Sequence, residues 1–117
     1  MVNKKKPRNP FEKKLHRQLS RAKVKFKYEA EKIPYLIAGH YVPDWIIETT
    51  TGKVYIEAKG YLRPEAKRKL VAVKKLNPHL DIRIVFYEER PAYVRWAIRN
   101  GFRYAIARIP TEWLIGL

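Results

Sequence analysis

The 117-residue sequence contains no cysteine, a single methionine and few acidic residues, with 11 aspartates and glutamates against 26 lysines and arginines. The absence of cysteine excludes disulfide bonds, thiol catalysis and zinc sites built on thiolates. No apolar run reaches the ~20 residues that a membrane-spanning helix requires, and no apolar segment of a secretory signal follows the basic start of the chain. We therefore expect a soluble, intracellular protein that is not bound to a membrane.

The charge of the chain is strongly one-sided, with a formal net charge of +15 and an isoelectric point near 10.2. Such a surface repels itself unless an anionic partner offsets the charge. A basic chain with many aromatic residues, here 13%, is typical of nucleic-acid binding. A membrane surface is the alternative partner, but it requires a basic amphipathic helix with a broad apolar face, and the short helices expected here are needed for the core.

The length and the 46% hydrophobic content predict one folded domain. We expect a flexible basic arm at residues 1–8 and a single domain at residues 9–117. Asn9 can cap a first helix, and Pro10 suits its first turn. The remaining pattern predicts strands at 25–31, 44–49, 54–59, 81–87 and 102–109, an extended stretch at 33–42, and helices at 64–76 and 91–100. This order predicts an α/β fold in which helices flank a mixed β-sheet.

Two carboxylates and a lysine are expected to meet at the edge of this sheet. Asp44 begins one strand of a predicted hairpin, and Glu57 and Lys59 lie on its return strand. Side chains alternate along a strand, so Glu57 and Lys59 point to the same face. The hairpin brings the strand of Asp44 beside them.

Carboxylates that converge in a chain suited to polyanions would repel phosphate unless a cation lies between them. Hard oxygen ligands with open positions suit Mg²⁺ or Mn²⁺, and such an ion can polarise a phosphoryl oxygen and acidify a bound water. Lys59 could orient that water or stabilise charge in the transition state. The pattern therefore predicts metal-dependent hydrolysis of phosphodiesters.

Each half of the pattern also has a common structural explanation. A glutamate and a lysine two positions apart on a strand usually form an exposed pair worth ~0–1 kcal/mol, and aspartate after proline is ordinary turn chemistry. The presence of both halves, one short hairpin apart in a chain of charge +15, favours catalysis.

Pro43-Asp44 and Glu57-Ala58-Lys59 together form the PD-(D/E)XK pattern of nucleases. A wider set of stretches resembles the phage endonuclease I family of Holliday-junction resolvases, namely residues 26–29, 33–35, 57–60, 81–86 and 109–113. The resemblance implies a restriction-endonuclease-like fold and cleavage of four-way and other branched DNA. It also implies a homodimer with exchanged elements, and a location in the host cytoplasm if a phage encodes the protein.

The resemblance further implies a catalytic site of four residues and a divalent metal, Mg²⁺ with Mn²⁺ able to substitute. Asp44 and Glu57 correspond to its acidic ligands and Lys59 to its lysine. The carbonyl of Ala58 and the carboxylate of Glu12 would complete the metal ligands. An alternative stays open for Glu12, because its spacing from Asn9 is that of a capping box and it could serve the helix alone.

Candidate DNA contacts are basic residues in the arm and the second helix, together with a histidine that could touch the scissile phosphate near neutral pH: Lys4, Lys5, Lys6, Arg8, Arg63, Lys67, Arg68 and His40. Contacts to phosphates and branch shape should dominate over contacts to bases. His16 is predicted to be a solvated surface residue, and the three tryptophans are predicted to be core residues rather than platforms for stacked bases.

Some alternatives remain open at this point. Residues 33–42 could cross between subunits of an exchanged dimer, or could fold back so that each subunit has its own complete site. The chain could also be a nuclease of the same fold that acts on nicked or duplex DNA. A third possibility is an architectural DNA-binding protein whose acidic residues only pair with lysines.

Overall fold

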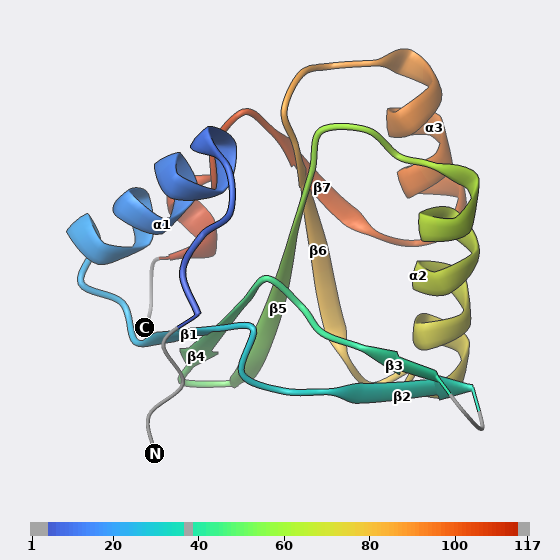
Figure 1. The fold of residues 1–117 in the computed structure, drawn as a ribbon, viewed down its shortest axis with the longest axis horizontal. Helices are drawn as coiled ribbons and strands as arrows, with labels where there is room; N and C mark the ends of the chain where they lie inside the picture. Colours follow the sequence, from blue (N-terminus) through green and yellow to red (C-terminus); the bar gives the residue numbers. More distant parts are fainter. Residues whose placement is uncertain (1–4, 37–38, 115–117) are drawn as a thin grey trace.

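The computed structural model describes residues 5–36 and 39–114, which form helical layers on both sides of one mixed sheet (Figure 1). The sheet has five strands in the order β1-β4-β5-β6-β7. Their bounds are Phe26–Tyr28 (β1), Trp45–Thr49 (β4), Gly52–Lys59 (β5), Asp81–Phe86 (β6) and Arg103–Ile106 (β7). Neighbours from β1 to β5 are antiparallel, and those from β5 to β7 are parallel. The predicted mixed sheet with flanking helices is confirmed.

Each face of the sheet has its own apolar core, because apolar side chains alternate along the central strands. On β5, Val54 and Ile56 face one core, which is covered by α1 (Pro10–Arg21), whereas Tyr55 faces the other. That second core is covered by α2 (Pro64–Leu76) and α3 (Pro91–Arg99). Burial on both faces fixes the strand register, because a slip of one residue would exchange the two sets of side chains.

The start of α1 follows the predicted capping. Oδ1 of Asn9 accepts a hydrogen bond from the backbone N–H of Glu12 at 2.8 Å, and Pro10 occupies the first turn. Leu15 and Leu19 are fully buried against the sheet. The inner face of α1 therefore sets the position of Glu12, which lies one turn before Leu15.

The β4–β5 hairpin brings the predicted catalytic residues together. Its turn depends on Gly52, whose φ of 136° favours glycine. The register pairs Trp45 with Ile56, so Asp44, just before β4, lies beside the end of β5 that carries Glu57 and Lys59. The sequence predicted this hairpin within two residues at each end.

Residues 33–42, which were predicted to be extended, contain a reversal. The stretch forms two short strands, β2 (Ile33–Leu36) and β3 (Gly39–Tyr41), which pair antiparallel in a separate small sheet. The stretch therefore folds back on itself within the chain, rather than running extended throughout. Other boundaries differ by a few residues. The first predicted strand ends at Tyr28, since Glu29 has a φ of 47°, and the short 3-10 helix η1 (Thr111–Trp113) follows the last strand.

Among the described residues, no helix is both long enough and apolar enough to cross a membrane.

Candidate active site

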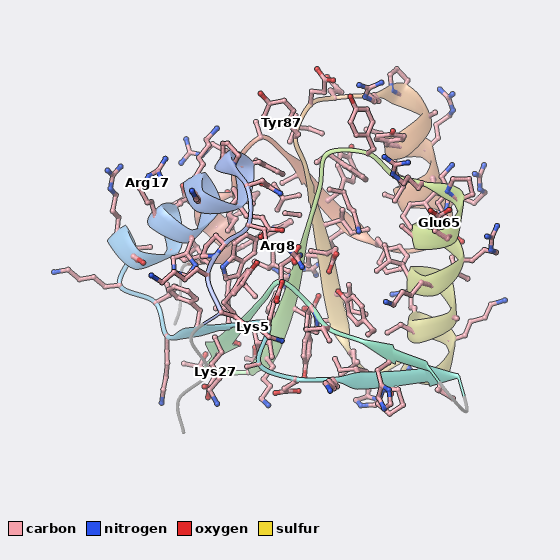
Figure 2. All side chains as sticks on the ribbon, viewed as in Figure 1. Lys5, Arg8, Arg17, Lys27, Glu65 and Tyr87 are labelled. Carbon is pink, nitrogen blue, oxygen red and sulfur yellow. The ribbon has the colours of Figure 1, made fainter. Side chains whose placement is uncertain are left out.

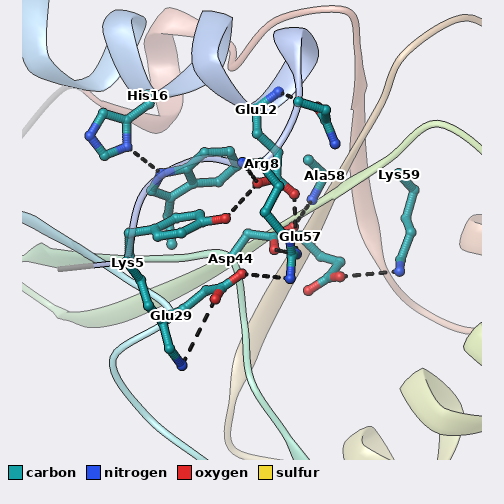
Figure 3. A network of polar contacts seen from close by, with 12 residues as sticks. Lys5, Arg8, Glu12, His16, Glu29, Asp44, Glu57, Ala58 and Lys59 are labelled. Carbon is teal, nitrogen blue, oxygen red and sulfur yellow. Dashed lines mark hydrogen bonds and ion pairs between the residues drawn. The ribbon is translucent and has the colours of Figure 1, made fainter. Parts of the chain in front are cut away.

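Three carboxylates from separate parts of the chain meet where β4 begins (Figure 3). Glu12 lies in the first turn of α1, Glu29 follows β1, and Asp44 precedes β4. One oxygen of each lies within 4.8 Å of the others. Clustered carboxylate oxygens are ligands that suit a hard divalent cation such as Mg²⁺ or Mn²⁺, so this set of donors fits the metal that the resemblance implies.

Asp44 is held in place by the backbone on both sides of it. Its Oδ2 accepts a hydrogen bond from the N–H of Ala58 at 2.8 Å, and its own carbonyl accepts one from the N–H of Glu29 at 3.0 Å. The residue is only 2% exposed. Burial, with a further contribution from the nearby charge of Glu57, raises the pKa of Asp44 to about 8.

Glu57 and Lys59 lie beside Asp44, where the structure has a cavity of about 400 Å³ that all three line together with Glu29. Oε1 of Glu57 accepts a hydrogen bond from the hydroxyl of buried Tyr41 at 2.8 Å, and its Oε2 lies 3.3 Å from Nζ of Lys59. Burial raises the pKa of Glu57 even though Lys59 and Tyr41 act in the opposite direction. The cavity thus combines buried carboxylates that bind protons tightly with several cations that line it, among them Lys59 beside Glu57.

Glu12 takes part in both the helix start and the carboxylate cluster. Its Oε1 accepts hydrogen bonds from the backbone N–H of Arg8 at 3.1 Å and from the hydroxyl of Tyr28 at 2.6 Å. The reciprocal half of a capping box would use the N–H of Asn9 instead. The side chain is 4% exposed and supplies an oxygen to the cluster with Glu29 and Asp44, so its capping contacts do not remove it from the site.

Arg8, predicted as a DNA contact, lies among the carboxylates (Figure 3). Its guanidinium forms ion pairs with Glu29 at 3.0 Å and with Glu12 and Asp44 at 3.3 Å each. Lys5 also approaches Glu29, at 4.0 Å. The described end of the basic arm therefore touches the site, while Lys4 lies outside the described residues.

The other predicted DNA contacts lie around the cavity or away from it. Lys6 is exposed. The first turns of α2 border the cavity through Ala66 and Lys69. They carry the predicted contacts Lys67 and Arg68, and Arg63 directly precedes the helix; Arg63 and Arg68 are exposed. His40 is exposed on β3, and the neighbouring Tyr41, on the opposite side of that strand, is the one that lines the cavity.

Two residues near the site were missed or misjudged from the sequence. Glu29 lies within one of the stretches that carry the resemblance, but its strand-like pattern gave no sign of a turn that points it at Asp44. His16 was predicted to be solvated, which is wrong: its Nδ1 accepts a hydrogen bond from Nε1–H of Trp45 at 3.2 Å, and its ring contacts Phe26 at 5.0 Å between centroids. Burial lowers the pKa of His16.

The tryptophans follow the core prediction in part. Trp45 and Trp96 are buried in the two cores. Trp113 is half-buried, and the guanidinium of Arg83 lies over its ring at 5.2 Å.

Comparison with known proteins places the chain in a family. The family described as phage endonuclease I matches residues 2–116. The chain belongs to this family. Endonuclease I of Escherichia phage T7 is 31% identical over 118 residues, covering 92% of this chain and 77% of that protein. Endodeoxyribonuclease 1 of Enterobacteria phage T3 is 32% identical over 114 residues, covering 88% of this chain and 73% of that protein. The resemblance found in the sequence is confirmed, and the chain is a phage endonuclease I family member with its carboxylates gathered beside the PD-(D/E)XK hairpin.

Proposed function

We propose that this member of the phage endonuclease I family is a metal-dependent endonuclease that cuts four-way and other branched DNA by phosphodiester hydrolysis. The observation that supports the proposal best is the convergence of Glu12, Glu29 and Asp44, with ligand oxygens within 4.8 Å, in a chain of net charge +15. Buried carboxylates repel phosphate, and a divalent cation reverses that effect. The names of the relatives, an endonuclease and an endodeoxyribonuclease, agree with this reading.

In this proposal the acidic residues hold the ion and the lysine acts on the reacting groups. The proposed metal ligands are Asp44, Glu57, Glu12 and the carbonyl of Ala58. Glu29 joins this set because its carboxylate lies beside those of Glu12 and Asp44. When bound, Mg²⁺ or Mn²⁺ would polarise the phosphoryl oxygen and lower the pKa of an attacking water. Lys59 is placed by its ion pair with Glu57 at 3.3 Å, and its ammonium can stabilise the charge that develops on the phosphate oxygens.

DNA binding is assigned to the basic residues that surround the cavity. The described part of the arm, residues 5–8, reaches the carboxylates through Arg8, and the first turns of α2 border the same cavity. Contacts of this kind are made to the phosphate backbone and do not depend on the base sequence. We therefore expect selectivity for branch shape, and action in the cytoplasm of a host cell, where the DNA is.

We also propose that the active form is a homodimer. Cutting opposed strands of a four-way junction requires two equivalent sites, which a two-fold dimer supplies. In the structure a single chain contributes Glu12 and Asp44 to one cluster. An exchanged dimer can form the same contacts between chains if the β2–β3 hairpin opens, because domain swapping replaces internal contacts with identical ones between subunits.

Cleavage of a four-way junction in Mg²⁺, compared with the same assay in EDTA, tests the proposal. Asp44→Asn and Glu57→Gln should each abolish cleavage and leave junction binding intact or tighter, because each change removes a carboxylate that repels phosphate when it is deprotonated. Arg95→Gln, an exposed substitution on α3, serves as the control for handling and folding. Near wild-type cleavage by either site variant would refute the site.

The same assay separates the alternatives. A panel of linear, nicked and four-way substrates distinguishes a junction enzyme from a nuclease of the same fold with another target. Junction binding without any Mg²⁺-dependent cleavage would instead indicate an architectural DNA-binding protein.

A further inference from the structure

The outer face of α1 carries a basic hollow that is separate from the carboxylate cavity. The hollow has a volume of about 380 Å³ and is lined by Lys14, Arg17, Gln18, Arg21 and Arg108. Four of these five residues are cations, and no carboxylate from the described part of the chain lines the hollow. Within residues 5–36 and 39–114, none of the four cations forms an ion pair.

The hollow lies on the side of α1 that faces away from the proposed site. An α-helix turns ~100° per residue, which places Lys14, Arg17 and Arg21 roughly 140–200° around the axis from the buried Glu12. Figure 2 shows Arg17 projecting outward from α1, whereas Arg8 lies toward the centre of the molecule. All four cations of the hollow are exposed, so a ligand can reach them from solvent without entering the cavity of Asp44.

The fold holds these like charges together from two distant parts of the chain. Nε2 of Gln18 donates a hydrogen bond to the carbonyl of Ile109 at 2.6 Å, and the N–H of Ile109 donates one to Oε1 of Gln18 at 2.9 Å. This reciprocal pair fixes Arg108, the residue before Ile109, beside α1. The spacings of Lys14, Arg17 and Arg21 are i,i+3 and i,i+4, at which like charges destabilise a helix.

We propose that this hollow binds the phosphate backbone of a DNA arm other than the arm held at the carboxylates. Arginine guanidinium groups bind phosphate oxygens in pairs of hydrogen bonds, and a bound polyanion offsets the repulsion among the four cations. A helix ~10–12 Å thick lies between the two sites, so they contact different segments of one branched molecule. The inference rests on the proposed function, because it assumes that the substrate is branched DNA.

The test is equilibrium binding without Mg²⁺, measured for a four-way junction and for a linear duplex of one arm's length. Arg17→Gln/Arg108→Gln removes two charges from the hollow and leaves every residue of the proposed site unchanged. The matched control, Arg95→Gln/Arg99→Gln, removes two exposed charges from α3. We expect the hollow variant to bind the junction more weakly. The slope of the logarithm of affinity against the logarithm of salt concentration should become shallower by about 1.8, since each lost phosphate contact on duplex DNA contributes about 0.9.

The duplex should bind the hollow variant almost as well as the unaltered protein, and the control should keep the junction slope. Junction cleavage at saturating protein should also continue at the unaltered rate. The inference is overturned by an unchanged junction slope, by an equal loss in the control, or by an equal loss on the duplex. The proposed function would be refuted by a different result, namely the absence of Mg²⁺-dependent cleavage by the unaltered protein. The binding measurements described here are independent of that result.

Discussion

Nη2 of Arg8 lies 3.3 Å from Oδ1 of Asp44, although the two residues are 36 positions apart in the chain. The same guanidinium pairs with Glu12 and Glu29. A positive side chain thus lies among the carboxylates that are proposed to hold a metal ion. Arg8 links the arm, which was predicted to bind DNA, to the electrostatics of the cleavage site.

Replacing Arg8 should therefore strengthen metal binding. Arg8→Gln removes a cation that competes for the same oxygens, and a charge as exposed as this one is worth ~1 kcal/mol or less. We expect affinity for Ca²⁺ in the absence of DNA to rise by about threefold to fivefold, as measured by titration calorimetry. Arg95→Gln should leave the affinity unchanged. A weaker affinity in Arg8→Gln would show that Arg8 assembles the ligands rather than competing with the ion.

The raised pKa of Asp44 predicts a pH-dependent stability. With a folded pKa of about 8 and an unfolded one of about 3.9, the folded state holds more protons between these values. The free energy of unfolding of the metal-free protein should then fall as pH rises from about 4 to 8, by up to ~1.4 kcal/mol per pH unit for this group. Urea unfolding in EDTA at several pH values measures this free energy of unfolding. Asp44→Asn should flatten the slope, and parallel slopes for the two proteins would contradict the prediction.

The hydrogen bond from Tyr41 to Glu57 should influence the charge of Glu57. Tyr41→Phe removes a donor to a buried carboxylate, which costs about 1–3 kcal/mol of stability and raises the pKa of Glu57 further, because that bond lowers it. The rising limb of the cleavage rate should move to higher pH, because metal ligands must lose their protons. Tyr55→Phe alters a buried tyrosine on the same strand as Glu57 and should leave the pH profile unchanged. A profile that moves equally in both variants would indicate a general structural effect.

A mixed dimer distinguishes exchanged sites from sites formed within one chain. The Glu12→Ala and Asp44→Asn subunits are co-expressed, and the heterodimer is purified through two different tags. With exchange, one site collects both substitutions and the other is intact, so the heterodimer should nick one strand of a junction. Without exchange each site carries one substitution and neither should cut. The comparison requires that both parent homodimers be inactive, which is measured alongside.

The sequence was most informative where neighbours along the chain decide the structure. The β4–β5 hairpin and the alternation of Glu57 with Ala58 follow from period-two patterning and turn residues, so Asp44, Glu57 and Lys59 could be placed together in advance. The start of α1 follows in the same way from Asn9 and Pro10.

The sequence was least informative where contacts join distant residues. Glu29 turns toward Asp44 because its φ is 47°, a conformation that a non-glycine residue rarely adopts and that no local pattern predicts. The contacts of Arg8 with Asp44 and of His16 with Trp45 depend on how α1 packs on the sheet. The reversal between β2 and β3 was hidden because both halves have an extended pattern.

The reciprocal hydrogen bonds between Gln18 and Ile109 also have a consequence for synthesis of the chain. They join positions 91 residues apart, and the core beneath α1 includes Val85 and Ala105. While the chain is still being translated, α1 has emerged long before the residues that seat it, since synthesis proceeds from the N-terminus. Glu12 therefore joins Asp44 only after the chain has been made as far as Ile109, and a shorter nascent chain on the ribosome lacks an assembled cleavage site.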